Sequence, residues 1–283
     1  MTFLSHRSDP WKRLREYTPA RIGLGRVGVS QGTKDVLEFA EAHAHARDAV
    51  HAVIDVDALG NAFQHAGFDI IRVRSSASSR REFLQRPDLG RRLDQNSALL
   101  FSGISQPSGS RDPDDGSDAD GLKRLALVVG DGLSSRATML HALPVVMAVR
   151  SLLPEWEMNH VILAEQARVA LGDEVGALYA ATATLMLLGE RPGLQSADSL
   201  GAYVTYQPRI GRSDSERNCV SNIHAQGLQH DVAARKIASL LNAAALLKAS
   251  GIALRAKQNL SEPGMESDRD MTKTLAVDDN LKL

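Results

Sequence analysis

The sequence has little of several features that mark whole classes of protein. It contains one cysteine, which excludes an internal disulfide framework and fits a reducing compartment. No apolar run approaches the roughly 20 residues of a membrane-spanning helix. Aromatic residues make up only 4% of the chain, which disfavours stacking platforms for nucleic-acid bases. With 33 basic against 34 acidic residues, the net charge of −1 gives no electrostatic case for nucleic acid or an anionic membrane, so we expect neither as a partner.

What is present indicates an α/β protein of the cytoplasm. The 283 residues are 43% hydrophobic, enough to bury a sizeable core in one large domain or two modest ones. The N-terminal sequence MTFLSHRSDPWKRLREY becomes polar too early to supply the apolar region of a secretory signal. We therefore expect a cytoplasmic location.

Residues 1–65 are predicted to form a small helical region, because apolar residues recur there at helical spacing. Asp9 is predicted to be the N-cap of a short helix whose first residue is Pro10, and Thr33 can cap the longest helix. Further along, the segment 103–121 is rich in Gly, Ser, Pro and Asp and is predicted to be a flexible insertion. The elements expected before it are helices over 10–17, 33–53, 59–66 and 79–84 and a strand over 68–73.

Residues 66–254 show the alternation of strands and helices that is typical of a Rossmann-like parallel sheet. The run LALVV at 125–129 is continuous and apolar, as expected of a strand buried on both faces, and GDGLSS follows it as a tight turn into a helix. Pro144 is expected to kink or split that helix. The polar residues 255–283 are predicted to form a disordered tail. The other elements expected are strands over 161–164 and 185–188 and helices over 134–152, 173–179 and 231–248.

A glycine-rich motif near the N-terminus matches a nucleotide-binding pattern only in part. GLGRVG, with Gly23, Gly25 and Gly28, fits the dinucleotide-binding string G-x-G-x-x-G. That string needs a buried strand before it, and only Ile22 precedes the first glycine. We therefore interpret GLGRVG as a flexible glycine-bearing loop.

A histidine-rich helix offers a partial set of metal ligands. His43, His45 and His51 lie close to Asp48, which is three residues from both His45 and His51. However, His43 and His45 point to different sides of a helix, and Arg47 beside them would repel a cation. We expect a polar helix side that faces a partner, and no metal site.

The stretch from Leu185 to Gly227 is the most informative, because an apolar strand is followed there by a segment dense in glycine, proline and charge. Loops at the ends of parallel strands are where α/β proteins usually bind ligands. Glu190 directly follows the strand, and its carboxylate either accepts hydrogen bonds from a ligand's amides or pairs with an arginine. Cys219 lies between Arg217 and His224, so a lowered thiol pKa is one interpretation and a small packing residue is the other. The residues indicate an α/β ligand-binding domain without identifying the ligand.

A third motif involves His224. Asn222-x-His224-x-x-Gly227 resembles the D-x-H-x-x-G string with which some cobalamin proteins place a histidine below the cobalt. Its first position is Asn, so the carboxylate that would orient the imidazole is missing. We interpret the match as a coincidence that a mutation can test.

Several segments, in the same order, make the chain similar to the small (light) subunit of ethanolamine ammonia-lyase over roughly residues 11–250. The longest and most specific is LLGERPGLQSADSLGAYVTYQPRIGRSDSERNCVSNI from Leu187. The others are LREYTPARIGLGRVG from Leu14, LEFAEAHAHARDAV from Leu37, VVGDGLSS from Val128, RVALGDEVG from Arg168 and GL at Gly227.

The resemblance implies part of an adenosylcobalamin-dependent enzyme, which converts ethanolamine to acetaldehyde and ammonia by a radical mechanism. It implies a large TIM-barrel subunit that carries the substrate and radical chemistry, a small subunit that covers the corrin, and an α6β6 assembly. The corrin is expected to keep its own dimethylbenzimidazole on cobalt, in which case no histidine of the protein is required.

The resemblance also implies which residues contact the cofactor. In the family these are the valine of RVALGD, the glutamate of GERPGL and the cysteine of ERNC, which correspond to Val169, Glu190 and Cys219. A carboxylate can accept hydrogen bonds from corrin side-chain amides, while valine and a thiol can contact the ring edge. These are binding roles, so we expect no catalytic residue in this chain and activity only with the large subunit.

The sequence departs from the family pattern at its edges, and other functions remain open. Gly32 stands where the family usually has a proline, and neither the segment 103–121 nor the tail has a counterpart. Family members are often housed in bacterial microcompartments, so a location inside such a shell is a second expectation. The alternative function is a stand-alone cobalamin- or nucleotide-binding carrier or regulatory module, which would use His224 or the GLGRVG loop. A third is a scaffold in which Glu190 and Cys219 only pack.

Overall fold

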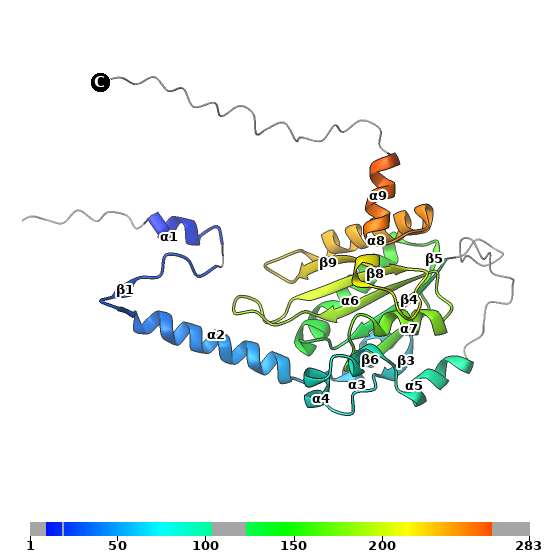
Figure 1. The fold of residues 1–283 in the computed structure, drawn as a ribbon, viewed down its shortest axis with the longest axis horizontal. Helices are drawn as coiled ribbons and strands as arrows, with labels where there is room; N and C mark the ends of the chain where they lie inside the picture. Colours follow the sequence, from blue (N-terminus) through cyan, green and yellow to red (C-terminus); the bar gives the residue numbers. More distant parts are fainter. Residues whose placement is uncertain (1–9, 19, 104–122, 262–283) are drawn as a thin grey trace, which may run out of the picture.

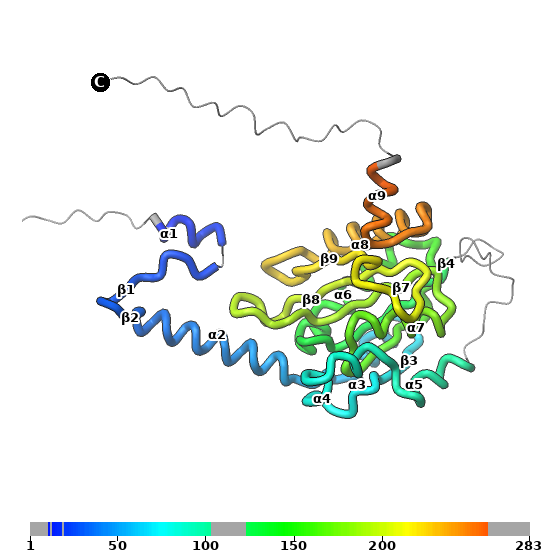
Figure 2. The backbone as a smooth tube through the Cα atoms, in the orientation of Figure 1, coloured from blue at the N-terminus to red at the C-terminus, as the bar shows by residue number. Residues whose placement is uncertain are grey.

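A seven-stranded sheet lies at the centre of the computed structural model, which describes residues 10–18, 20–103 and 123–261 (Figure 1). Helices pack on both faces of the sheet, while α2 leads away from it as an extended arm (Figure 2). The predicted insertion, apart from Gly103, and the tail beyond Ser261 lie outside the described residues. The described helices are α1 (Pro10–Arg15), α2 (Thr33–His51), α3 (Val56–His65), α4 (Arg80–Gln85), α5 (Gln95–Leu100), α6 (Ser135–Leu152), α7 (Leu171–Leu178), α8 (His230–Leu247) and α9 (Ile252–Ser261), with 3-10 turns η1 (Leu89–Arg91), η2 (Phe101–Gly103) and η3 (Asp214–Glu216).

Five strands of the sheet, β3 to β7, run parallel, as the sequence predicts for most of the sheet. β4, β6 and β7 are apolar runs buried on both faces for most of their length. β4 lies between the other two, so that Val128 is paired with both Ile162 and Met186. The prediction of a mixed α/β fold with a mostly parallel sheet is confirmed. The order in the sheet is β3-β6-β4-β7-β8-β9 with β5 beside β4, and the strands are β1 (Arg26–Val27), β2 (Ser30–Gln31), β3 (Asp69–Arg74), β4 (Lys123–Gly130), β5 (Trp156–Glu157), β6 (His160–Glu165), β7 (Ala183–Gly189), β8 (Leu200–Tyr206) and β9 (Asn218–Ile223).

Two strands that the sequence analysis does not predict, β8 and β9, extend the sheet in antiparallel fashion. β8, with the sequence LGAYVTY, mixes glycine, alanine and threonine with larger residues, so it shows neither an apolar run nor a clean alternation. It lies between β7 and β9 in the sheet, and α6 and α8 pack against it. The segment 185–227 therefore folds largely into the sheet, and an entirely parallel sheet is not what forms.

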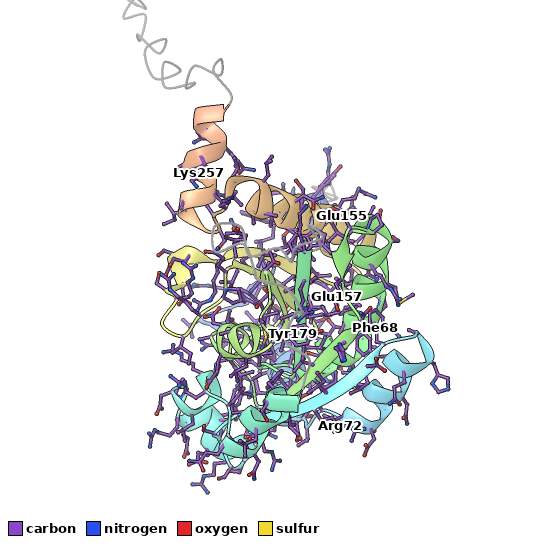
Figure 3. The ribbon with its side chains drawn as sticks, turned by 90° about the vertical axis from the view of Figure 1, so that its right-hand side faces the viewer. Phe68, Arg72, Glu155, Glu157, Tyr179 and Lys257 are labelled. Atoms are coloured by element: carbon purple, nitrogen blue, oxygen red, sulfur yellow. The ribbon has the colours of Figure 1, made fainter. Side chains whose placement is uncertain are left out.

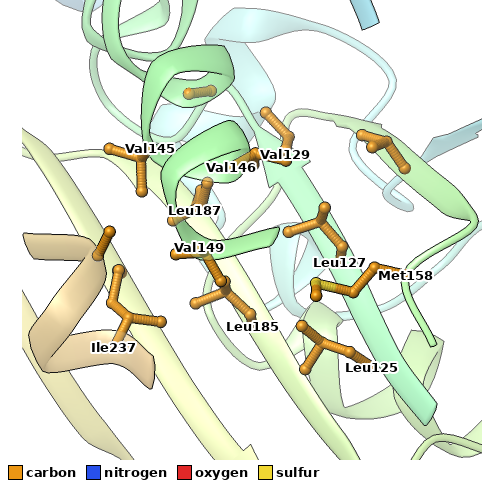
Figure 4. Packing of buried hydrophobic residues seen from close by; sticks show 14 of the residues in the cluster. Leu125, Leu127, Val129, Val145, Val146, Val149, Met158, Leu185, Leu187 and Ile237 are labelled. Atoms are coloured by element: carbon orange, nitrogen blue, oxygen red, sulfur yellow. The ribbon is translucent and has the colours of Figure 1, made fainter. Parts of the chain in front are cut away.

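An apolar layer covers each face of the sheet. On one face, α3, α6 and α8 supply the layer, and Figure 4 shows Val145 and Val149 of α6 beside Leu127, Leu185 and Ile237. On the other face, α7 packs over β4 and β7 with a second cluster. Each fully buried aliphatic side chain of this kind contributes about 1.5–3 kcal/mol, so these layers hold the sheet and helices together.

The turn after β4 and the end of β7 approach each other backbone to backbone. Gly132 has a φ of 54°, and a Cβ at this position would collide with the carbonyl oxygen of Gly189. The backbone N–H of Leu133 donates to the same oxygen at 2.8 Å. This contact fixes the carboxyl ends of the two strands relative to each other, at the edge where ligand-binding loops are expected.

The N-terminal arm consists of α1, the hairpin β1–β2 and α2 (Figure 2). α2 begins at Thr33 with Gly32 at the N-cap and no side-chain cap, so Thr33 is not the cap that the sequence predicts. The base of the arm is tied to the body, because the Ser135 hydroxyl donates to the carbonyl oxygen of Ala52 at 2.8 Å. α3, which follows, packs against the sheet through Leu59 and other core residues.

The structure bears on two details of the predicted helices. α6 runs through Pro144 as one helix, so the proline does not split it, because Ala142 and Val145 on either side are both fully buried in the core. α9 stands out from the body, with Lys257 on it (Figure 3), and continues to Ser261. Residues 255–261 of the predicted disordered tail are therefore helical.

No single helix in the described ranges is long and apolar enough to cross a membrane. Only α8 and most of α9 taken together meet the criteria of length and composition, and a bend of 76° separates them. α8 contributes Ile237 and Leu241 to the core.

Candidate functional site

The three residues predicted to contact a ligand come from three different strands. Val169 follows β6, Glu190 directly follows β7, and Cys219 lies within β9. β9 is antiparallel to β8, which is antiparallel to β7, so all three strands point the same way. β6 and β9 are separated by four strand spacings, about 19 Å, so the set draws on widely separated strands of the sheet.

Strand pairing, for Glu190 and Cys219, and packing, for Val169, place the three residues on the same face of the sheet, the face covered by α7. Val169 and Tyr203 both pack against the apolar cluster on that face, and Cys219 shares it because it lies directly opposite Tyr203. Glu190 lies against Gly201, which precedes Tyr203 by two residues and so has the same orientation. α7 packs over β4 and β7, and Cys219 on the outer strand is exposed.

The Glu190 carboxylate is held by its neighbours through one of its oxygens. Oε2 accepts hydrogen bonds from the Ser199 hydroxyl at 2.5 Å and from the backbone N–H of Asn222 at 3.2 Å. Oε1 lies beside Gly201, where an added Cβ would approach it to 3.0 Å. No ion pair among the described residues involves Glu190, so Oε1 is the oxygen placed to accept a hydrogen bond from a ligand.

The Cys219 thiol is less acidic than an ordinary cysteine. Desolvation by the surrounding protein, followed by the negative charge of Glu190, raises the pKa of the thiol. The interpretation of a thiol activated by Arg217 and His224 is therefore wrong. The arginine is engaged by carboxylates, and the histidine hydrogen-bonds Asn222. Cys219 is suited to contact a ligand and unsuited to act as a nucleophile at neutral pH.

Much of the charge in the segment 185–227 serves to fix the start of β9. Arg217 pairs with Asp173 of α7, and both side chains are only 3% exposed; it also bonds Asp214 at 2.7 Å. Arg212 pairs with Glu216 at 2.5 Å and donates to backbone carbonyls at the end of β8. These charges position the strand that carries Cys219, which is a structural use that the sequence analysis does not anticipate.

His224 does not project from the surface as a lower ligand of cobalt would. Its side chain is buried, and its Nε2 lies 2.8 Å from the Asn222 side-chain oxygen. Gly227 packs so closely on the imidazole that an added Cβ would collide with it. Asn222 therefore satisfies the histidine locally, which supports the interpretation of the motif as a coincidence.

Neither of the two N-terminal motifs has the geometry of the ligand site that its sequence pattern suggests. GLGRVG lies partly in the hairpin β1–β2, with Gly28 in its turn at a φ of 66°, so it is not the strand-to-helix turn of a dinucleotide site. On α2, His43 and His51 line one cavity, whereas His45 and Asp48 line another. Within the described residues, no three His, Cys, Asp or Glu side chains are grouped as ligands of one metal ion.

The sequence analysis does not connect three further residues with Glu190, although it notes Asn222 in the motif around His224. Ser199, Asn222 and Gly201 surround the Glu190 carboxylate, although they are 9 to 32 residues away from it in the chain. Serine, asparagine and glycine are common in turns, so their types alone carried no signal. Only the register of β7, β8 and β9 brings them together.

Comparison with known proteins gives consistent matches over most of the chain. The family model "Ethanolamine ammonia-lyase light chain (EutC)" matches residues 8–255. The ethanolamine ammonia-lyase small subunit of Bradyrhizobium diazoefficiens is 46% identical over 250 residues, covering 87% of this chain and 90% of that protein. Those of Pseudomonas paraeruginosa and Xanthomonas campestris pv. campestris are 41% and 46% identical, covering 93% and 87% of this chain and 93% and 88% of those proteins.

Proposed function

The chain belongs to the ethanolamine ammonia-lyase light-chain family, and from this membership we propose that its task in the lyase is to bind adenosylcobalamin together with a large subunit. The enzyme is a carbon–nitrogen lyase that converts ethanolamine to acetaldehyde and ammonia. The stand-alone carrier or regulatory module is not favoured, because the relatives are named as small subunits.

The observation that carries this proposal is the arrangement around Glu190. Its Oε1 is free of the hydrogen bonds that hold Oε2, and it lies on the same face as the exposed Cys219 and the half-buried Val169. A corrin ring is wide, apolar at its edge and rich in side-chain amide donors. One acceptor and two apolar contacts carried by three separate parts of the sheet suit such a ligand.

When bound, adenosylcobalamin supplies the radical that abstracts hydrogen from the substrate. In the proposal this chain's residues bind and orient. Glu190 accepts a hydrogen bond from a corrin amide, and Ser199 and the Asn222 N–H hold its carboxylate in place. Cys219 and Val169 contact the ring edge. No residue of this chain moves a proton or carries a covalent step.

The name "small subunit" of the relatives implies a large partner subunit, and we propose an α6β6 assembly in the cytoplasm or inside a bacterial microcompartment. We further propose that residues 66–254 act as a Rossmann-like cobalamin-covering domain, with 1–65 as a helical N-terminal domain and 255–283 as a tail. Limited proteolysis tests this division. Cleavage near residue 65 that leaves a folded fragment supports it, and loss of the fold on cleavage there contradicts it.

The first experiment is co-expression of this chain with a large subunit from a related bacterium. Acetaldehyde release from ethanolamine is then measured with and without adenosylcobalamin. We expect activity only when both chains and the cofactor are present. Full activity of the large subunit alone would contradict the proposal.

A substitution at Glu190 tests the binding role directly. Glu190→Gln keeps the shape but weakens the acceptor, so the complex should bind adenosylcobalamin about ten-fold more weakly, as for loss of a charge-assisted hydrogen bond. The matched control is Glu155→Gln, an exposed residue in the turn after α6 (Figure 3), which should leave the affinity unchanged. Loss of folding with Glu190→Gln, seen by circular dichroism, would instead favour the scaffold interpretation.

A further inference from the structure

A cavity with a cationic lining lies beside the proposed cofactor contacts. It has a volume of about 500 Å³, is open to solvent, and is bordered by the C-terminal half of α2, by α4 and by the segments after β4, β6 and β7. Arg47, Arg168 and Arg191 line it together with His43 and His51, and no acidic residue does. No ion pair among the described residues includes any of these three arginines. The cavity therefore concentrates positive charge that this chain leaves uncompensated.

Arg168 is the arginine most firmly fixed at this cavity. Its guanidinium lies 4.3 Å from the centre of the Phe83 ring and donates to the carbonyl oxygen of Phe83 at 3.2 Å. Its Nε atom is buried and has no hydrogen-bond partner. Desolvation, followed by the positive charges of Arg80, Arg91 and Arg191, lowers the pKa of Arg168. Arg80, Arg212 and Arg217 also have an unpartnered buried nitrogen, but each of them pairs with a carboxylate. A guanidinium that is held in place without such a carboxylate can bind an anion from outside the chain.

The neighbouring Arg80 differs from Arg168 because a carboxylate of the same chain neutralises its charge. It also stacks on Phe83, at 4.9 Å, but it donates to the Asp131 carboxylate at 3.0 Å. Arg168 donates to no carboxylate among the described residues, and the charge of Asp131 acts on it only as the last of several influences on its pKa. Two arginines thus lie against one aromatic ring, and only Arg80 forms an ion pair with a carboxylate of this chain.

Positive charge is not general to the surface around this cavity. A second cavity of about 610 Å³ lies on another side of α2, and Gly193 and Leu194 line both. The second cavity is lined by the acidic residues Glu38, Glu41, Asp48 and Asp198. The segment after β7 thus borders one cationic and one largely acidic cavity.

We propose that the cationic cavity binds the phosphodiester of the cofactor's nucleotide loop, an inference that rests on the proposed function. Arg168 immediately precedes Val169, and Arg191 immediately follows Glu190, so the cavity adjoins the positions proposed to contact the corrin. A corrinoid with its nucleotide loop carries one phosphodiester anion, which two guanidinium groups recognise well.

The rest of the cavity fits what is attached to that phosphate. Its volume exceeds that of a phosphate ion and falls in the range of small-molecule sites. Leu84, Leu133 and Leu194 supply an apolar wall for a sugar and a heterocyclic base. A free phosphate would use the arginines and leave this wall without a contact.

The test compares three corrinoids on the complex of this chain with the large subunit. Adenosylcobalamin has the phosphodiester and the base, adenosylcobinamide methyl phosphate has only the phosphodiester, and adenosylcobinamide has neither. Affinities are measured by absorbance titration for the wild type and for Arg168→Met and Arg191→Met. Arg81→Met, an exposed arginine of α4 that does not line the cavity, is the control.

We expect each cavity substitution to weaken the first two corrinoids about ten-fold or more, as for loss of a charge-assisted contact, and to leave adenosylcobinamide unchanged. The wild-type affinity for adenosylcobalamin should also fall more steeply with added KCl than that of Arg191→Met. Equal weakening of all three corrinoids, or no change in any, overturns the inference. So does preferential binding of inorganic phosphate without discrimination among the corrinoids.

Two further outcomes distinguish the phosphodiester inference from failure of the proposed cofactor site and from binding of a partner segment. If Glu190→Gln changes the affinity for none of the three corrinoids, the proposed cofactor site itself is wrong. If Arg168→Met or Arg191→Met dissociates the two subunits in the absence of cofactor, measured by size-exclusion chromatography, the cavity receives an acidic segment of the partner, which overturns the phosphodiester inference. Arg191 is exposed, so its variant should fold even if Arg168→Met does not.

Discussion

The Asp131 carboxylate accepts a hydrogen bond from Arg80 at 3.0 Å, and this buried pair joins the end of β4 to the start of α4. The two side chains are 3% and 11% exposed. Asp131 also accepts from the backbone N–H of Ala167 at 3.0 Å, and so holds the loop after β6. Burial raises the pKa of Asp131 to about 6 and lowers the pKa of Arg80, although the two charges oppose these shifts in each other. The pair links the loops that carry Val169 and the cationic cavity.

Removing one partner of this pair should destabilise the fold. Arg80→Met leaves Asp131 buried without its counter-charge, and we expect the free energy of unfolding at pH 7 to fall by about 3 kcal/mol. The double variant Arg80→Met with Asp131→Asn should recover part of the loss, because no charge is then buried. Urea denaturation measures both. Substitution of the neighbouring exposed residue, Arg81→Met, should leave the free energy of unfolding unchanged. An equally small effect of Arg80→Met would show that the ion pair does not contribute to stability.

The same carboxyl group should make stability depend on pH in a direction opposite to most acids. Its pKa of about 6 in the folded state is above the unfolded value of roughly 3.9, so the folded state holds a proton that the unfolded state has lost between these values. Its contribution to the unfolding free energy therefore falls as pH rises from about 4 to about 6, by on the order of 3 kcal/mol. The difference in unfolding free energy between wild type and Asp131→Asn should change over this range and be flat above it. Parallel curves for the two proteins would contradict the assignment.

The alkylation rate of Cys219 can be measured without interference, because it is the single cysteine of the chain. Its raised pKa predicts slow alkylation by iodoacetamide at pH 7, slower than that of a free thiol compound. Glu190→Gln removes a nearby negative charge and should speed the reaction at a given pH. In the complex, adenosylcobalamin should protect the thiol. Rapid alkylation at neutral pH would instead indicate an activated cysteine.

Replacing His224 should leave the cobalt environment unchanged. The imidazole is buried and bonded to Asn222, so it is not available as a lower ligand. The absorption spectrum of cobalamin bound to the complex should therefore be the same for wild type and His224→Ala. His224→Gln serves as the milder variant if His224→Ala does not assemble. A spectral change in a variant that still forms the complex would revive the histidine-ligand interpretation.

Part of the fold follows from local sequence. The run at 125–129 and those at 161–164 and 185–188 predict strands correctly, because a strand buried on both faces needs only a short continuous apolar stretch. Helix α8 was predicted within a residue at each end, from its apolar spacing. β8 was missed because its composition is not apolar enough to show that it is buried. Its place depends on pairing with β7 and β9, which no local pattern encodes.

The sequence by itself determined the family, through a long specific segment, and with it the identities of Val169, Glu190 and Cys219 as residues to examine. It could not determine which charges are already satisfied. Arg217 and Arg168 look alike in the sequence, yet one is neutralised by Asp173 and the other faces a cavity without a carboxylate. The reason is physical: the energy of a charge depends on what lies within a few ångströms of it. Those neighbours come from distant parts of the chain that only the strand order and the helix crossings bring together.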